Sequence, residues 1–293
     1  MGVRDNRKVR FAHGIANLTL VQLTSKTVAD FRDQMRSAGV SIPLIRHVIA
    51  TLHTMLEFAR LENITSINTA RGVRVIGKRN EGSKKVTPPS KELVRALLDE
   101  ASTDFRPKLL FAVSTGVRAG EMRGLRWRHI DFGKSQVRVE TRIDTYGNED
   151  DQGTKTAAGM RTIPLSWQVV AQLRDSRARS RFSSDDDFVF AGASGRWVCQ
   201  TYIREQQFYP LFDKIAQKHV SDPLKYPAPK RCTWHALRHF AISTWIEAGL
   251  SPKAVQTFAG HSSLQMTMDR YGHLFPSENH SIAMDAISDQ LSN

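Results

Sequence analysis

The sequence predicts a mainly α-helical protein with a small β-sheet, an α+β fold, arranged in two domains. Apolar residues recur at helical spacing along most of the 293 residues. Strand-like alternation is confined to the middle of the chain, over 136–143 and 154–165. Basic residues, glycines and prolines interrupt the pattern over 71–89. We therefore expect a helical domain over 1–70, a linker over 71–89 and a larger mixed domain over 90–275.

Two helices are expected in the first domain. The first begins after Thr24, whose side chain can cap it, and ends at Gly39. The second follows Pro43 and carries a broad apolar stripe that extends to Met55 and beyond. Arg46 lies off that stripe, where it meets either solvent or a polyanion.

The second domain is expected to begin with a helix capped by Ser90. A more apolar helix then ends at Gly116, a residue suited to a left-handed cap. Arg118 follows at the start of a short helix, and Glu121 three residues later is placed to pair with it. Because a guanidinium in an apolar setting needs an anionic partner, Arg118 is a candidate for binding an anionic substrate.

Further along the chain, 136–143 reads as one strand and 154–165 as a hairpin that carries Lys155. Amphipathic helices are expected over 166–182 and about 200–219, and Tyr202 is expected in the core. A last apolar helix is expected in a tail over 276–293. That helix packs either on its own chain or on a neighbouring protomer.

Residues typical of phosphodiester chemistry cluster between 234 and 275. His235 and Arg238 share a helix face, and Gly260-His261 precedes Tyr271 by ten positions. Arginine offers a planar fork of donors to phosphate oxygens. Histidine exchanges a proton near neutral pH, and tyrosine can act as a nucleophile.

Six candidate residues in chain order are Arg118, Lys155, His235, Arg238, His261 and Tyr271. This order resembles the tyrosine recombinases, the family of phage integrases and related site-specific recombinases, firmly from Pro88 onward. The resemblance implies a helical core-binding domain, a catalytic domain and a 3′-phosphotyrosyl intermediate formed without metal or other cofactor. It further implies a site-specific enzyme that integrates or excises a mobile element.

The resemblance also implies a role for each residue. Tyr271 attacks the scissile phosphorus while Arg118 and Arg238 hold the two non-bridging oxygens. Lys155 protonates the leaving 5′ oxygen, and His261 donates to a non-bridging oxygen.

His235 either accepts the tyrosine proton or shares a hydrogen bond with the phosphate. Glu121 orients Arg118, and His239 is a supporting residue. His235 and His239 are also spaced as zinc ligands, but Arg238 between them would repel a cation.

The net charge of +13 and the pI of about 10 favour a polyanionic partner. With the resemblance, this predicts double-stranded DNA attachment sites, a homotetramer on DNA and accessory DNA-bending or directionality proteins. Residues expected to contact DNA phosphates are Arg46, Arg74, Lys78, Arg79, Lys84 and Lys85. Two distant cysteines and the lack of an apolar leader or membrane span predict a cytoplasmic protein.

Two other functions fit the same residues. A type IB topoisomerase-like enzyme would use the same tyrosine to nick and close DNA without pairing two sites. A catalytically inactive regulator would keep the fold and bind DNA without cleaving it.

Two origins fit the start of the chain, which lies just before the expected core-binding helices. Either an N-terminal arm-binding domain has been removed, or the protein is a short recombinase.

Overall fold

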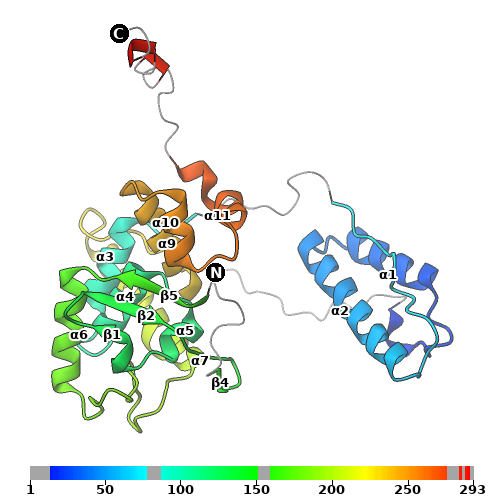
Figure 1. Cartoon of the computed structure of the whole chain (residues 1–293), viewed down its shortest axis with the longest axis horizontal. Coiled ribbons are helices and arrows are strands. Elements are labelled where there is room, and N and C mark those ends of the chain that lie inside the picture. Colours follow the sequence, from blue (N-terminus) through cyan, green and yellow to red (C-terminus); the bar gives the residue numbers. More distant parts are fainter. Residues whose placement is uncertain (1–13, 78–86, 151–158, 276–283, 286–287, 291–293) are drawn as a thin grey trace. The chain divides into compact units, whose positions relative to one another are not determined.

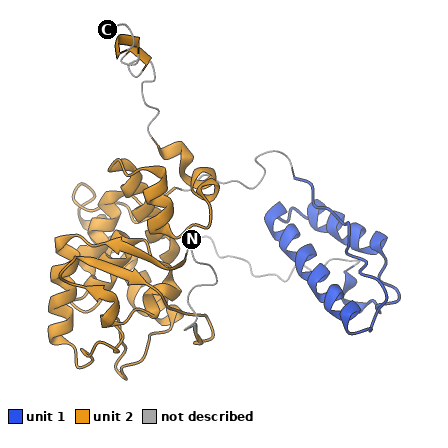
Figure 2. Cartoon of the chain, in the orientation of Figure 1, with its two compact units in different colours: residues 1–84 blue, residues 85–293 orange. Residues whose placement is uncertain are grey.

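The computed structural model describes residues 14–77, 87–150, 159–275, 284–285 and 288–290. The chain divides into two compact units, residues 1–84 and 85–293 (Figure 2). The predicted α+β class is confirmed, because helices dominate and the sheets are short. Of the last predicted helix, most residues lie outside the described ones. No helix in the described ranges has the length and apolar character needed to cross a membrane.

The first unit is built from two helices that pack side by side (Figure 1), α1 (Ser25–Ser37) and α2 (Ile42–Leu61), after a short 3₁₀ turn, η1 (Ile15–Asn17). The Thr24 side chain caps α1 by accepting from the backbone N–H of Thr27, as expected. The hydrophobic core of the first unit consists of Leu23, Val28, Met35, Ile42, Ile45, Ile49, Leu56 and Ala70. The expectation that Met55 extends the buried stripe is wrong, because this side chain is 64% exposed.

Residues 71–77, part of the predicted linker, pack against this first unit. Val73 and Val75 contact its core. Backbone carbonyls of the same segment accept hydrogen bonds from arginines of α1 and α2: Arg32 to Arg74, Arg36 to Ile76 and Arg46 to Val75. Guanidinium groups therefore fasten this part of the chain to the two helices.

The second unit begins with α3 (Lys91–Glu100), α4 (Arg106–Thr115) and α5 (Ala119–Arg123). Strands β1 (Ile130–Asp131), β2 (Gln136–Val139) and β5 (Arg161–Pro164) form an antiparallel sheet in the order β1-β2-β5. Val137 is paired with Ile163 and is fully buried. Strands β3 (Arg142–Ile143) and β4 (Glu149–Asp150) form a separate ribbon. The single strand predicted over 136–143 is therefore wrong, because the chain leaves the first sheet after Val139.

The remaining helices carry residues discussed below (Figure 1), with α10 against β5, α6 and α9 against α4, and α8 against α3. They are α6 (Trp167–Arg179), α7 (Gln200–Tyr202), the π-helical turn η4 (Ile203–Phe208), α8 (Tyr209–Ser221), α9 (Trp234–Glu247), α10 (Pro252–Ala259) and α11 (Leu264–Tyr271). Short 3₁₀ turns lie at η2 (Trp127–His129) and η5 (Gly272–Leu274). The expected core position of Tyr202 is wrong, since the side chain is 54% exposed.

Gly116 ends α4 in the left-handed conformation, at φ +58°. A Cβ at this position would lie 3.1 Å from Ala241 and 3.1 Å from Trp245, both on α9. Only glycine adopts this backbone conformation at little cost, and only glycine lets α9 approach so closely. The turn after α4 and its distance from α9 therefore depend on this residue.

We expect Gly116→Ala to lower the free energy of unfolding by about 2–4 kcal/mol, from backbone strain and crowding together. Gly249→Ala is the matched control, because Gly249 has φ +84° but no atom within 4 Å of an added Cβ. The control should lose only the backbone contribution, about 1–2 kcal/mol. Urea unfolding of both variants makes the comparison, and equal losses would show that α9 does not constrain this turn.

Candidate active site

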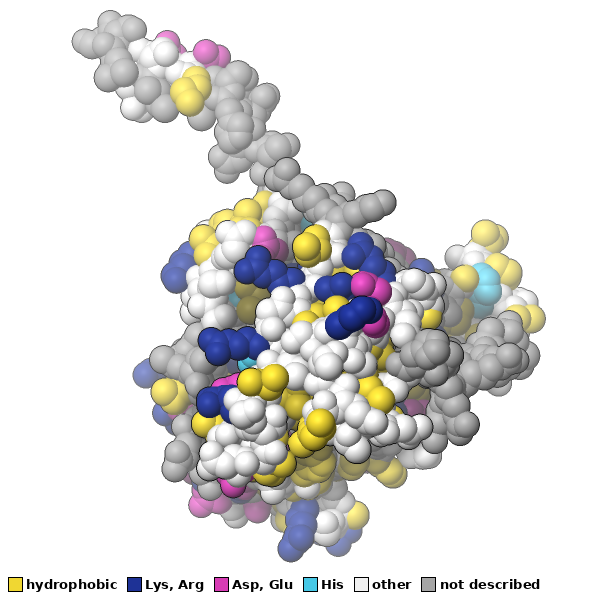
Figure 3. Space-filling model, turned by 90° about the vertical axis from the view of Figure 1, so that its right-hand side faces the viewer, with side chains coloured by type: hydrophobic (Ala, Val, Ile, Leu, Met, Phe, Trp, Pro, Cys, Tyr) yellow, Lys and Arg dark blue, Asp and Glu magenta, His cyan; other side chains and the backbone are white. Residues whose placement is uncertain are grey.

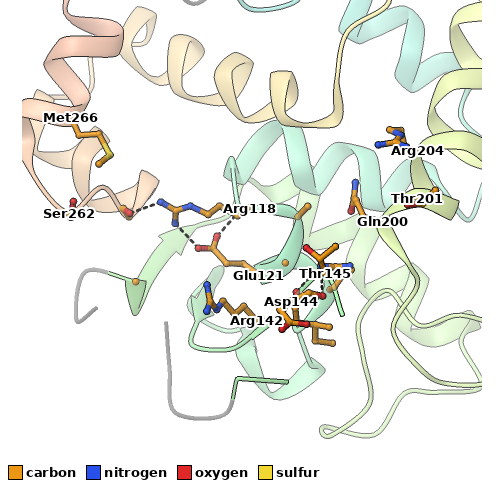
Figure 4. A pocket seen from close by; sticks show the side chains of 16 residues that line it. Arg118, Glu121, Arg142, Asp144, Thr145, Gln200, Thr201, Arg204, Ser262 and Met266 are labelled. Carbon is orange, nitrogen blue, oxygen red and sulfur yellow. Dashed lines mark hydrogen bonds and ion pairs between the residues drawn. The ribbon is translucent and has the colours of Figure 1, made fainter. Parts of the chain in front are cut away.

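Arg118 is positioned by the turn between α4 and α5. It occupies the N-cap of α5, and its backbone N–H donates to Oε2 of Glu121 at 2.7 Å. Its guanidinium Nη1 donates to Oε1 of the same carboxylate at 2.8 Å. The predicted pairing of Arg118 with Glu121 is thus present (Figure 4). Because backbone and side chain bind one carboxylate, the direction of the guanidinium is set by the local fold.

Glu121 is itself held by a second arginine, Arg161 on β5. Both side chains are buried, and Nη2 and Nη1 of Arg161 donate to the carboxylate at 2.8 and 3.1 Å. Burial by itself raises the pKa of the Glu121 carboxyl, but Arg161 and Arg118 together outweigh burial and hold that pKa at about 2. Glu121 is therefore a fixed anion at any physiological pH.

Arg161 is not among the candidate site residues predicted from the sequence. Its Nε also donates to the carbonyl of Phe258 at the end of α10, at 2.7 Å. The signal that could have found it is the alternation of β5, which places Arg161 on the buried side with Ile163. A charged residue on the inward side of a strand needs a buried partner of opposite charge.

Two arginines meet at the last carbonyls of α10. Nη2 of Arg118 donates to the Gly260 carbonyl at 2.9 Å, and Nη2 of Arg238 donates to the Ala259 carbonyl. Nη1 of Arg238 donates to the Gly116 carbonyl at 2.7 Å. These bonds join α4, α9 and α10 and place both guanidinium groups in one corner of the unit.

Arg238 is only 4% exposed, and no carboxylate of the described residues forms an ion pair with it. Burial lowers the pKa of this guanidinium to about 9, and the neighbouring cation of Arg118 adds to the effect. A buried cation whose hydrogen-bond partners are backbone carbonyls lacks a compensating negative charge. The corner is therefore suited to an anion.

His261 follows Gly260, which turns the chain at φ +64° after α10. The imidazole is buried, and its Nδ1 lies 2.9 Å from the hydroxyl of Thr267. Burial, reinforced by nearby arginines, lowers the pKa of His261 to about 3, so the ring is neutral. When the Thr267 hydroxyl donates to Nδ1, Nε2 carries the proton and can donate to an anion.

Tyr271 ends α11 and is 1% exposed. Its ring is stacked on that of His261, with centroids 6.2 Å apart and an angle of 14°. Its hydroxyl lies 2.5 Å from Nδ1 of His239 on α9. Burial raises the pKa of the Tyr271 hydroxyl, although Arg238 and Arg270 oppose that effect. In this structure the phenol is a protonated, covered group.

His239, and not His235, contacts the tyrosine hydroxyl. Burial and the adjacent His235 and Arg238 lower the pKa of His239 to about 4, so its ring is neutral and can accept a proton. His235 is exposed, and its ring centroid lies 4.8 Å from that of His239. The sequence predicts His235 either as the proton acceptor or as a phosphate partner, and His239 as a supporting residue. The structure places His239 at the tyrosine hydroxyl.

A cavity of about 710 Å³ opens beside Arg118 (Figure 4). Gln200 and Arg204 lie across the cavity from Arg118 and also line a smaller cavity of about 230 Å³ that reaches His235 and Arg238. Both polar atoms of the Gln200 amide are covered and have no hydrogen-bond partner within the described structure. The two cavities thus lead from the corner that holds Arg118 and Arg238 along the surface of the second unit.

Several predicted residues cannot be placed. Lys155, Lys78, Arg79, Lys84 and Lys85 lie outside the described residues. Arg74 is exposed, and Arg46 is bonded to the Val75 carbonyl. Across the described ranges, no three His, Cys, Asp or Glu side chains gather as a metal site would need.

Arginines, histidines and a tyrosine are thus gathered in one corner of a mainly helical unit with a small sheet, as the tyrosine recombinase resemblance implies. The chain belongs to the phage integrase family, whose model matches residues 89–278. The tyrosine recombinase resemblance seen in the sequence is therefore confirmed.

Known relatives include a tyrosine recombinase-like protein and an integrase. A tyrosine recombinase XerC-like protein of Caldanaerobacter subterraneus subsp. tengcongensis is 25% identical over 282 residues, covering 87% of this chain and 68% of that protein. The ICEBs1 integrase of Bacillus subtilis is 22% identical over 271 residues, covering 92% of this chain and 72% of that protein.

Solved structures share the fold. The Tn1549 transposon integrase in complex with transposon right end DNA has a TM-score of 0.68 at 20% identity, covering 94% of this chain and 88% of that one. A lambda integrase dimer bound to a COC′ core site has a TM-score of 0.57 at 16% identity, covering 89% and 66%.

We expect Arg161→Met to lower the free energy of unfolding by about 3–5 kcal/mol, because it leaves the buried Glu121 carboxylate with fewer partners. Adding Glu121→Gln removes the buried charge, so the double variant should lose less than the sum of the single losses. The stability that the depressed pKa of Glu121 contributes is present above pH 4.5 and is lost as the pH falls toward 2. Urea titrations of both single variants and the double variant measure the coupling, and strict additivity would contradict it.

Proposed function

We propose that the chain is a site-specific tyrosine recombinase that integrates or excises a mobile element through a 3′-phosphotyrosyl DNA intermediate. The observation that carries this proposal is buried Arg238, which has no carboxylate partner in the described structure and lies in the same corner as Arg118 and Tyr271. A phosphodiester supplies the missing negative charge. Membership of the phage integrase family supports the same reaction.

In the proposed reaction the phenolic oxygen of Tyr271 forms a bond to the scissile phosphorus as the bond to the 5′ oxygen breaks. Arg118 and Arg238 stabilise the charge on the non-bridging oxygens, and His261 donates to one of them. The tyrosine proton passes to His239, the group that its hydroxyl contacts. Lys155 gives a proton to the leaving 5′ oxygen, and the reverse steps join the tyrosine-linked strand to another 5′ end.

The covered position of Tyr271 adds a requirement to this reaction. At 1% exposure the hydroxyl cannot reach a phosphate that approaches from solvent. We infer that α11 or the turn after it moves when DNA binds, bringing the hydroxyl toward the two arginines. The burial that raises the pKa of Tyr271 is lost in that movement, which favours ionisation.

The proposed partner is double-stranded DNA. On the face drawn in Figure 3, Lys and Arg side chains form separate patches with hydrophobic side chains between them. Together with the net charge of +13, they favour a polyanion. Integrases of similar fold have been solved with DNA, among them that of Tn1549. A homotetramer on DNA, accessory DNA-bending proteins and metal-independent cleavage complete the proposal.

Tyr271→Phe should abolish covalent protein–DNA adducts while leaving DNA affinity within about twofold of wild type, because only the nucleophilic oxygen is removed. The measurement uses a nicked suicide duplex that carries the attachment site flanking the gene, with adducts resolved on denaturing gels. Tyr202→Phe, at an exposed tyrosine on α7, is the matched control and should form adducts normally. Adducts of normal yield from the Tyr271 variant would exclude this residue as the nucleophile.

His239→Gln should slow cleavage by about 10²-fold or more, as loss of a proton acceptor does, and should exceed the effect of His235→Gln. Since the pKa of His239 is about 4, the wild-type rate should not fall between pH 8 and pH 6 through protonation of this ring. Single-turnover cleavage across that pH range measures both effects. A larger loss in the His235 variant would assign the proton transfer to His235 instead.

A further inference from the structure

A buried lysine lies near the beginning of α4. The opposite end of this helix reaches the corner that holds Arg118, Arg238 and Tyr271, called here the catalytic corner after its proposed role. Lys108 is 5% exposed, although lysine is among the residues least often buried without a partner. Its ammonium lies 5.9 Å from the ring centroid of Phe190 and makes no hydrogen bond or ion pair with any described residue. Burial lowers the pKa of Lys108 to about 8, and the charge of Asp104 offsets only part of that effect.

The lysine lines a pocket of about 280 Å³ between α4, α6 and residues 180–193. Arg179 and Arg181 line the same pocket, whereas Asp104 is its one carboxylate among the described lining residues. Arg179 already contacts Asp175 at 2.7 Å and Asp104 at 3.5 Å. With Asp175 included, three cations thus meet two carboxylates, which leaves one net positive charge at the pocket.

Nothing in the described fold explains the charge at this position. A cation that supports a core normally pairs with a buried carboxylate, as Arg161 pairs with Glu121. An apolar side chain of similar length would fill the space beside Phe190 without the cost of burying an ammonium group. Lys108 instead presents an ammonium without an ion-pair partner among the described residues to an open pocket, an arrangement suited to binding an anion.

We propose that this pocket is a binding site for a phosphate group, separate from the catalytic corner. A phosphate monoester carries about −1.5 to −2 charges at neutral pH and offers three strong acceptor oxygens. Lys108 and Arg181 both line the pocket, where the ammonium supplies up to three donors and the guanidinium supplies a planar fork. The pocket volume suits one such group with its immediate substituent.

The catalytic corner is too far away to share this ligand. Lys108 and Gly116 lie eight positions apart on α4, which is roughly 12 Å along a helix. Two sources offer a phosphate group to this pocket: a free phosphorylated molecule, or the backbone of bound DNA, whose phosphodiester carries one negative charge on two non-bridging oxygens. The single helix α4 connects the pocket to the turn that carries Arg118.

The test measures binding of inorganic phosphate to the full-length protein by isothermal titration calorimetry, at constant ionic strength with chloride as the balancing anion. Lys108→Met removes the ammonium and keeps the length of the side chain. Lys214→Met, at an exposed lysine of α8, is the matched control. Arg181→Ala is a second variant at an exposed position, which keeps the test valid if the core substitution prevents folding. A random 20-bp duplex, titrated in parallel, distinguishes DNA phosphate from free phosphate.

Wild type and the Lys214 variant should bind phosphate with equal affinity, and the Lys108 and Arg181 variants about tenfold or more weakly, as loss of a charged hydrogen bond predicts. If those two variants lose duplex affinity and phosphate affinity is too weak to measure in all four proteins, DNA is the source. Equal binding of both probes by all four proteins would overturn the proposal. The proposed recombinase function is tested separately, because adduct formation by Tyr271 does not depend on either result.

Discussion

The buried carboxylate of Glu121 is the constraint on which the arrangement of the second unit depends. A buried negative charge is tolerated only when its partners are close and well oriented, and here Arg118 and Arg161 provide them. Arg161 in turn bonds to the Phe258 carbonyl, so one carboxylate joins α5, β5 and the end of α10. Displacing any of these elements would leave a charge unpaired. The cost of burying an unpaired charge therefore fixes the position of Arg118, the proposed catalytic arginine.

Two left-handed glycines make the same corner accessible to arginines of α5 and α9. Gly116 and Gly260 end α4 and α10, and their carbonyls accept from Arg238 and Arg118 respectively. A Cβ on Gly260 would lie 2.9 Å from the guanidinium of Arg161. The close packing brings the guanidinium groups of Arg118 and Arg238 together. No described carboxylate pairs with Arg238, so this corner carries an excess of positive charge. That excess is what a phosphate would neutralise.

The tyrosine and the arginines are not yet arranged for reaction. Tyr271 is covered, protonated and bonded to neutral His239, while Arg238 holds backbone carbonyls. The backbone carbonyls leave the charge of Arg238 uncompensated, and a phosphodiester would compensate it in the proposed function. Burial raises the pKa of Tyr271, the proposed nucleophile, and lowers the pKa of its neighbour His239. In the proposed function, movement of α11 on DNA binding would uncover Tyr271 and so remove the burial that raises the pKa of its hydroxyl.

By itself the sequence determined the α+β class, the helix caps at Thr24 and Ser90 and the pairing of Arg118 with Glu121. The caps and the ion pair are local, because each joins residues within one helical turn. The α+β class follows from helical and strand periodicity along the chain. The tertiary structure alone decided the partners that lie far apart in the chain. It bonded Arg161 to Glu121 across 40 residues, and it placed His239 rather than His235 at the tyrosine hydroxyl. Such contacts depend on how helices and strands pack, and helical or strand periodicity shows which side of an element is buried but not what meets it there.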